Sequence, residues 1–240
     1  MTFLPILLPL AHLSPAEPCS KRMVFCRILF PVLARLYESL ACDDAVQTAD
    51  LIFVFAGRIE RKQYGLELFR SGLAPVLLIS VGRYEVSRMC NLDLEGVPEL
   101  TALREQTPPD ERHFFIELEK SKISIEKVKL PFWNTYGEAL GLRRFLEDEE
   151  ISRVIVISTD IHLRRVRTAI ARAFRGKSIE FLYCPVPSHL SFKKADWWSR
   201  SKDRRYVFSE MLKLAAYRLI LPMPRKLSYW IMRLKSPNSI

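Results

Sequence analysis

Short continuous apolar runs, each flanked by glycine or polar residues, constrain the fold of this 240-residue chain more than any other feature. Residues 50–57 have the sequence DLIFVFAG, residues 76–82 VLLISVG and residues 153–158 RVIVIS. Because polar and apolar residues do not alternate along these runs, the pattern is typical of strands buried on both faces of a sheet. We therefore expect the three runs to be central strands.

Helical patterns lie between and after these runs, so strands and helices alternate along most of the chain. Gly72 is an expected helix stop, because glycine tolerates the left-handed conformation at a helix end. We expect helices over residues 61–70, 135–149, 161–174 and 204–221, and further strands over residues 113–116, 123–125 and 179–183. The alternation predicts a Rossmann-like three-layer α/β/α fold with a mainly parallel sheet.

The last expected helix carries apolar residues at helical spacing. We expect this stripe to be the face of the helix that closes one face of the sheet. Its members are Phe208, Met211, Leu212, Ala215 and Leu219.

The composition is that of one ordinary globular domain, with 49% hydrophobic and 27% charged residues. We expect an N-terminal helical extension over residues 1–45, an α/β domain over residues 46–221 and a basic amphipathic tail over residues 222–240. The five cysteines form no C-x-x-C pair, which argues against a disulfide framework and a zinc knuckle. No apolar segment reaches the roughly 20 residues that span a bilayer, so we expect a cytoplasmic protein.

The chain is basic, with 37 Lys and Arg against 27 Asp and Glu and a formal net charge of +10. This excess favours contact with phosphates, nucleic acid or an anionic membrane without choosing among them. Nucleic acid is the weakest choice, because no strand alternates aromatic and basic residues. The tail either docks on its own domain or lies peripherally on an anionic membrane, since apolar residues at helical spacing accompany Arg225, Lys226, Arg233 and Lys235.

Signatures of several enzyme classes are absent from the sequence. The chain has neither G-x-G-x-x-G after a strand nor G-x-x-x-x-G-K-[ST], which argues against a dinucleotide-binding protein and an NTPase. It also lacks G-x-S-x-G, H-E-x-x-H and a Cys/His set with the spacing of metal ligands. We therefore expect no metal site, and the position of polar residues in the fold has to indicate the functional site.

Polar residues follow the expected strands where parallel strands end. Ligands of open parallel sheets bind beyond the C-terminal strand ends, where helix N-termini expose unpaired N–H groups and a partial positive charge. We therefore expect a site for a phosphate-like or carboxylate-like anion. The ligand-binding candidates are Gly57, Arg61, Ser80, Gly82, Asn134, Thr135, Thr159 and Arg165.

Three titratable residues near these strand ends are the catalytic candidates. His162 lies at the start of an expected helix, where a proton carrier would reach a bound substrate, and its alternative is a packing or solvent-facing histidine. Glu138 completes the pattern Thr135-x-x-Glu138, which is also a capping box. Asp160 is either catalytic or a helix N-cap.

In these segments the chain resembles the YdcF, SanA and ElyC family, long catalogued as a domain of unknown function. The correspondence covers roughly residues 50–217. The family has an aspartate before an apolar strand, a glycine after it and an arginine near the next helix, matched by Asp50, Gly57 and Arg61. A Ser-Gly-Gly turn follows the next strand, and here Ser80 and Gly82 flank a valine.

The second half of the family pattern is also matched. An Asn-Thr pair followed by a glutamate corresponds to Asn134, Thr135 and Glu138, and a late helix bearing a glutamate resembles the segment around Glu210. The most specific element is a strand leading into Thr-Ser/Asp-x-His-x-x-Arg, matched by Thr159, Asp160, His162 and Arg165.

The resemblance implies a Rossmann-like fold with a polar pocket formed by the matched residues. It also implies a link with the bacterial cell envelope, because members are connected with peptidoglycan and lipid-carrier processes. One member is linked to S-adenosylmethionine, which makes that molecule a candidate ligand.

Our leading hypothesis is an envelope-related hydrolase or group transferase that acts on a phosphate-bearing or nucleotide-like small molecule. In this hypothesis Arg61 and Arg165 hold the anion. Asn134 and Thr135 orient it.

The same hypothesis assigns proton transfer to His162, with Asp160 or Glu138 fixing the imidazole. The alternative is a non-catalytic protein that senses a nucleotide or S-adenosylmethionine and regulates envelope biogenesis. Product formation separates the two, because only the enzyme changes its ligand.

Overall fold

The structure is a computed structural model that describes residues 32–92, 94, 96–119, 122–131, 135–187 and 197–223. The chain divides into residues 1–36 and residues 37–240, and the sheet lies in the second unit. Asn134 and the basic tail lie outside the described residues. In the described ranges, no helix is both long enough and apolar enough to cross a membrane.

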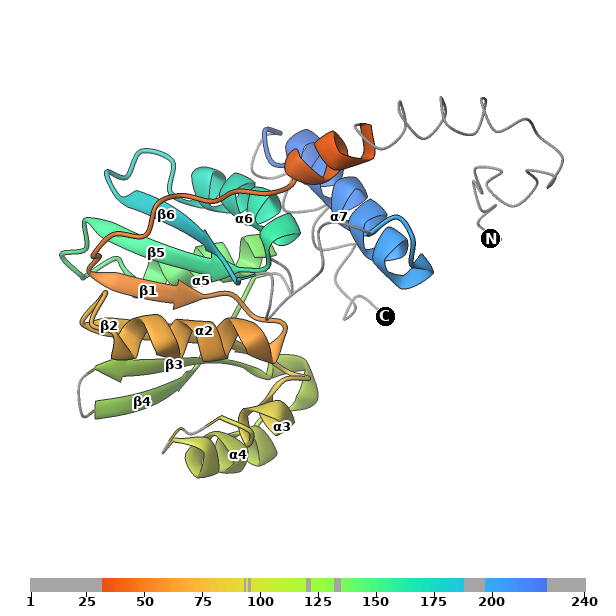
Figure 1. Ribbon diagram of the computed structural model, residues 1–240. Coiled ribbons are helices and arrows are strands. Elements are labelled where there is room, and N and C mark those ends of the chain that lie inside the picture. The colour runs from red at the N-terminus through yellow and green to blue at the C-terminus, as the bar shows by residue number, and fades with distance from the viewer. Residues whose placement is uncertain are drawn as a thin grey trace, which may run out of the picture. The chain divides into compact units, whose positions relative to one another are not determined.

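One six-stranded sheet organises the second unit (Figure 1). Its strands are β1 Leu51–Val54, β2 Val76–Gly82, β3 His113–Glu119, β4 Lys122–Lys127, β5 Arg153–Ser158 and β6 Glu180–Pro185, in the order β4-β3-β2-β1-β5-β6. β1 pairs parallel with β2 and β5, and β5 pairs parallel with β6. β3 pairs antiparallel with both β2 and β4. The expected mainly parallel sheet is confirmed.

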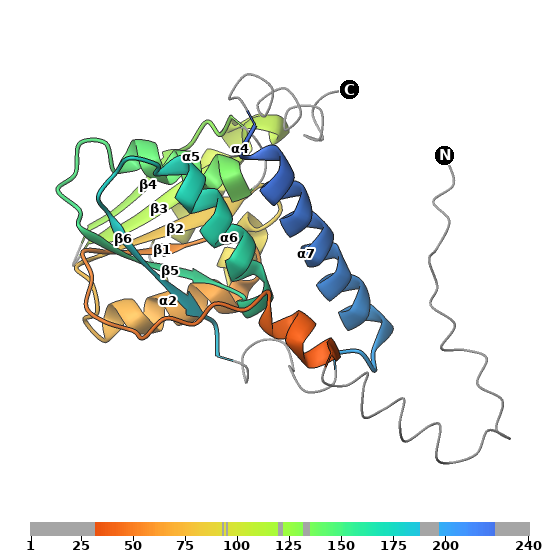
Figure 2. The ribbon, with the colours of Figure 1, turned by 90° about the horizontal axis from the view of Figure 1, so that it is seen from above.

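Helices cover both faces of the sheet (Figure 2). They are α2 Ile59–Arg70, α3 Val86–Met89, α4 Val97–Gln106, α5 Thr135–Phe145, α6 Asp160–Ala173 and α7 Ser201–Ile220, with a short 3-10 turn at Pro109–Glu111. α2 lies on one face, whereas α5 and α6 lie on the other, and α7 packs against α6. This arrangement is the Rossmann-like three-layer fold that the sequence predicts.

The central strand β1 explains why the apolar runs are continuous. Leu51 and Phe53 point to one side and Ile52 and Val54 to the other, because successive side chains of a strand alternate. All four are at most 1% exposed. The first pair packs in the core with residues of α5 and α6, and the second pair with residues of α2.

Gly65 determines how closely α2 approaches the sheet. A Cβ atom at this position would lie 2.5 Å from Cγ2 of Val54, so the helix backbone packs directly on β1. A larger residue would push α2 away from the sheet, and the same helix carries Arg61.

The prediction for the inward face of α7 is wrong. Phe208, Leu212 and Leu219 are 42%, 74% and 70% exposed. Apolar residues occur on both sides of this helix, so their periodicity does not identify the buried side. The buried side is the one whose Glu210 bonds to Arg165 of α6. The buried residues are Val207, Glu210, Leu214, Tyr217 and Ile220.

Helix α5 is shorter than expected, because it ends at Phe145 rather than near residue 149. Residues 147–150 have the sequence EDEE. Carboxylates near a helix C-terminus face the negative end of the helix dipole, which disfavours extending the helix through them.

Candidate functional site

The C-terminal ends of β1, β2 and β5 lie at one edge of the sheet because the three strands are parallel. Gly57 and Thr159 follow β1 and β5, and Gly82 ends β2. β3 runs in the opposite direction, so its first residue, His113, pairs with Gly82 at the same edge. We call this the strand-end edge, and the described site candidates lie at it or are linked to it through hydrogen bonds.

Arg61 is a buried cation at the start of α2, only 4% exposed. It donates hydrogen bonds to the carbonyl of Ala56 and, at 3.0 Å, to Oγ1 of Thr159. Its Nε has no hydrogen-bond partner, and no ion pair among the described residues includes it. Burial lowers the pKa of Arg61, but a guanidinium stays protonated at neutral pH. The edge therefore holds a buried positive charge with no carboxylate bonded to it.

Gly57 creates the space that Arg61 occupies. Its φ of +137° is a left-handed conformation that favours glycine. A Cβ atom there would lie 2.6 Å from Nη1 of Arg61. The glycine that closes the first apolar run is thus required both by the backbone turn and by the arginine.

Glu138 bonds to the ends of β1 and β2, although it belongs to α5. Its Oε2 accepts hydrogen bonds from the backbone N–H of Ala56 and from Oγ of Ser80, each at 2.8 Å. Since Ser80 gives its only proton to Glu138, Nε2 of His113 must donate to Ser80, 2.8 Å away. Burial raises the pKa of Glu138 and lowers that of His113 to about 4.

The capping-box interpretation is wrong, because neither of its side chains caps α5. Thr135 is the first residue of the helix and contacts α6, and Glu138 contacts the strand ends. Both side chains point toward the strand-end edge rather than back along the helix backbone. The Thr135-x-x-Glu138 spacing places them one turn apart on the same side of α5.

His162 is held between two hydroxyl groups. Its Nδ1 lies 2.7 Å from Oγ of Ser158, and its Nε2 lies 3.2 Å from Oγ1 of Thr135. Burial lowers the pKa of His162 well below 6.5, and the charges of Arg165 and Arg61 add to this effect. The ring is therefore neutral at pH 7, and its proton can pass only to or from a hydroxyl oxygen.

Arg165 is the second buried arginine of the edge, and its side chain is 12% exposed. It forms a two-point contact with Glu210 of α7, with N–O distances of 3.0 and 3.3 Å, and it also donates to Thr135. Burial acts to lower its pKa, but Glu210 and Tyr217 outweigh this and raise it. Lys213 donates to the same carboxylate at 2.9 Å.

Asp160 faces away from His162. Its Oδ2 accepts a hydrogen bond from the hydroxyl of Tyr37, and its Oδ1 accepts one from the N–H of Ile161 at 2.8 Å. The expectation that Asp160 or Glu138 fixes His162 is wrong, because Ser158 and Thr135 do so. Asp160 is not the N-cap either, since α6 begins at Asp160 and the residue before it occupies the N-cap position.

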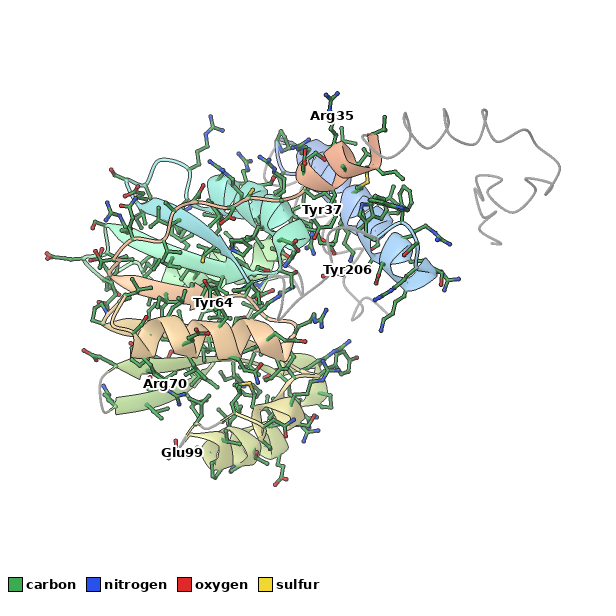
Figure 3. All side chains as sticks on the ribbon, in the orientation of Figure 1. Arg35, Tyr37, Tyr64, Arg70, Glu99 and Tyr206 are labelled. Carbon is green, nitrogen blue, oxygen red and sulfur yellow. The ribbon has the colours of Figure 1, made fainter. Side chains whose placement is uncertain are left out.

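Two tyrosines approach the strand-end edge where α7 lies (Figure 3). Tyr37 bonds to Asp160, and the hydroxyl of Tyr206 lies 3.4 Å from Oγ1 of Thr159. Thr159 thus lies between Tyr206 and Arg61. The two hydroxyls add polar groups to an edge that is already rich in them.

A second buried cation, Lys62, lies next to Arg61 and is 1% exposed. Its Nζ donates to the carbonyl of Gly57 at 3.1 Å and forms an ion pair with Glu85. Glu85 in turn lies over Gly82, where a Cβ atom would be 3.1 Å from its Oε1. Unlike Arg61, Lys62 is therefore paired with a carboxylate.

Sequence reasoning missed several residues of this edge. His113, Ser158 and Lys62 belong to no motif, and only the pairing of strands and helices brings them to the site. A signal was available for Ser158, because it ends a buried strand four residues before His162. Among the described residues, no group of three or more His, Cys, Asp or Glu side chains could hold a metal ion.

No family model matches the chain, and no curated protein or solved structure matches it either. The fold places the protein in the class of Rossmann-like α/β proteins with a polar strand-end edge. That class serves many unrelated activities, so the function has to be argued from the site.

Proposed function

We propose that the protein is an enzyme that acts on a phosphate-bearing or nucleotide-like small molecule of the cell envelope, as a hydrolase or a group transferase. The resemblance to the YdcF, SanA and ElyC family supports the envelope link, and the charges at the strand-end edge support the ligand class. The candidate residues are those named for binding and proton transfer, with Asn134 lying outside the described residues.

The observation that carries the proposal is the state of Arg61. A buried guanidinium without a bonded carboxylate is costly, because removal from water is not repaid by an ion pair. An anionic ligand would supply the missing charge and accept the free Nε–H. Phosphate suits this role, because its oxygens match the planar fork of arginine.

Two hydroxyls support ligand orientation in this proposal. Thr159 already bonds to Arg61, and Thr135 already bonds to Arg165, so each hydroxyl lies beside one arginine. They also begin or precede helices α5 and α6, whose N-terminal N–H groups favour an anion.

Proton transfer in this proposal runs through Thr135 rather than directly from the imidazole. His162 is neutral, and its Nε2 faces Oγ1 of Thr135. When the Thr135 hydroxyl takes a proton from the attacking water or alcohol, it passes its own proton to Nε2, while Ser158 holds the other ring nitrogen. Glu138, with its raised pKa, is the second candidate acid or base.

The test of ligand binding is a thermal-shift series with inorganic phosphate, nucleotides, polyprenyl phosphates and S-adenosylmethionine. A ligand at 100 times its Kd stabilises the native state by about 2.7 kcal/mol. We expect Arg61→Gln to abolish the shift and Arg61→Lys to retain part of it. The matched control is Arg175→Gln, at an exposed position after α6, which should respond like the unaltered protein.

Catalysis needs a separate measurement, namely phosphorus NMR or mass spectrometry of the stabilising ligand after incubation. We expect product from the unaltered protein and at least a hundredfold less from His162→Ala, as for the loss of a general base. Full turnover by His162→Ala and Thr135→Ala would sink the enzymatic part of the proposal.

One observation favours a second function, a non-catalytic sensor of a nucleotide or S-adenosylmethionine. Both ring nitrogens of His162 are engaged, and the residue is 5% exposed, so its environment also fits a structural histidine. A sensor would show saturable stabilisation without any product. The same panel therefore separates the two functions.

For location, we propose a cytoplasmic protein with peripheral contact at the inner face of the membrane. The basic residues between positions 225 and 235 support this contact by their charge. They lie outside the described residues, so only the sequence supports this membrane contact.

A further inference from the structure

The outward side of α7 is an unusual surface for a helix that packs on a domain. Phe208, Leu212 and Leu219 lie within an arc of about 40° on a helix of 3.6 residues per turn. All three are more than 40% exposed, with Leu212 at 74%. Three large apolar side chains in one exposed stripe are more than scattered surface residues, and such patches mark interaction sites.

The charges around this stripe are all positive. Arg205 lies on one side of it and Arg218 on the other, with Lys202 further round, and all three are exposed. No ion pair in the described part of the chain includes these cations. We call the stripe with these three cations the outer face of α7.

The acidic residues of α7 do not offset this charge. Glu210 is 3% exposed and is occupied by Arg165 and Lys213 on the inward side of the helix. Asp203 is half-buried. The helix therefore presents an apolar stripe flanked by cations outward and keeps its carboxylates away from the stripe.

We infer that the outer face of α7 docks on an anionic lipid surface, with the apolar side chains entering the boundary between headgroups and acyl chains. Amphipathic helices that lie on membranes combine an apolar stripe with flanking Lys and Arg. Each basic side chain near such a surface adds attraction to the anionic headgroups. This surface differs from the tail beyond residue 224 and does not depend on the proposed enzymatic activity.

Charge complementarity favours lipid over a second copy of the chain. Two copies meeting through this face would bring Arg205 and Arg218 of both chains together, with no exposed carboxylate of the face to neutralise them. Like charges at an interface cost free energy. An anionic bilayer neutralises all of them at once.

The inward side of the same helix reaches the strand-end edge through Glu210. Docking through the outer face would therefore place the Arg165 end of the edge within one helix diameter, about 10 Å, of the lipid headgroups.

The experiment is co-sedimentation of the full chain with vesicles of phosphatidylcholine alone and with added phosphatidylglycerol. We expect binding to the anionic vesicles that weakens at high salt. Changing Leu212→Ser together with Leu219→Ser, the two most exposed positions of the stripe, should lower the partition coefficient at least about tenfold, because two apolar side chains leave the lipid. The control is Tyr84→Ser, at a position that is 72% exposed, which should bind like the unaltered chain.

A second experiment tests the charges with two double variants. One combines Arg205→Gln and Arg218→Gln, and the control combines Arg88→Gln and Arg175→Gln, with all four residues at exposed positions. The first pair should weaken binding severalfold more than the second. No binding of the unaltered chain to anionic vesicles would overturn the inference. So would full binding by the apolar double variant, or a dimer in sedimentation velocity that this double variant dissociates.

Discussion

Arg61 and Arg165 are two buried arginines at the same edge of one sheet, but their surroundings differ. Arg165 contacts a buried carboxylate at two points and shares it with a lysine. Among the residues that the structure describes, Arg61 bonds only to a carbonyl and a hydroxyl, and its Nε has no partner. The first arrangement is complete without a ligand, whereas the second lacks an anion. The difference indicates that Arg165 mainly holds α7 to α6, while Arg61 is the primary anchor for an anionic ligand.

The largest expected effect tests whether the Arg165 pair is structural. Glu210→Gln leaves a buried guanidinium without its carboxylate, so we expect the free energy of unfolding to fall by about 3 kcal/mol in urea denaturation. The control is Glu180→Gln, which breaks the exposed pair with Arg153 and should cost less than about 1 kcal/mol. Equal losses would remove the contrast on which the comparison depends.

The next effect is the dependence of stability on pH that His113 causes at the strand-end edge. The pKa of His113 is about 4 in the folded protein, against 6.5 ordinarily, so the unfolded chain binds the proton first as pH falls. Stability from this group is complete above pH 6.5 and is lost as pH falls toward 4, by up to about 3 kcal/mol. Urea denaturation across this window measures it.

His113→Gln is the matching variant, because glutamine can still donate a hydrogen bond to Ser80. It should flatten the stability profile in the same window. The slope that remains belongs to the other groups whose pKa is shifted by folding, among them His162, Glu138 and Glu210. A profile unchanged by the substitution would contradict the buried, neutral state of His113.

A smaller effect tests the space around Arg61. Gly57→Ala should cost about 2 kcal/mol, because its φ of +137° is strained for alanine and the new Cβ meets the guanidinium. At Gly72 φ is +79° and no atom lies near an added Cβ, so we expect Gly72→Ala to lower the free energy of unfolding by about 1 kcal/mol. Only the first should also weaken the thermal shift with phosphate. A phosphate response unaffected by Gly57→Ala would argue against Arg61 as the anchor.

The smallest expected change in stability is at Arg61 itself. Arg61→Met removes a buried charge that has no ion pair, so the free energy of unfolding should change by no more than about 1 kcal/mol in either direction. Arg165→Met leaves Glu210 buried with only Lys213 and should cost clearly more. A larger loss at Arg61 than at Arg165 in parallel urea titrations would reverse the assignment of the two arginines.

Much of the fold follows from local pattern. The apolar runs that contain β1, β2 and β5 are buried on both faces, and such runs fit only the interior of a covered sheet. The sites at strand ends follow from the same reasoning, because parallel strands end at one edge. Position at the strand ends therefore predicts Arg61, Thr135 and His162 as site residues from the sequence.

The sequence pattern gave wrong predictions where it was equally compatible with two faces of a helix or with two sets of hydrogen-bond partners. The outer stripe of α7 has the same spacing as a buried one, and Thr135-x-x-Glu138 has the same spacing as a capping box. In both cases the side chains are directed by distant partners: Glu210 by Arg165, and Glu138 by Ser80 and Ala56.

The sequence by itself determined the alternation of buried strands and helices, because hydrophobic burial depends on periodicity that is local in the chain. Only the tertiary structure decided which charges are paired. The partners of Arg165, His113 and His162 come from elements far apart in sequence or from the strand before, and a hydrogen bond depends on distance and angle that spacing does not specify. For the same reason, only the structure distinguished the arginine that has its carboxylate from the one that lacks it.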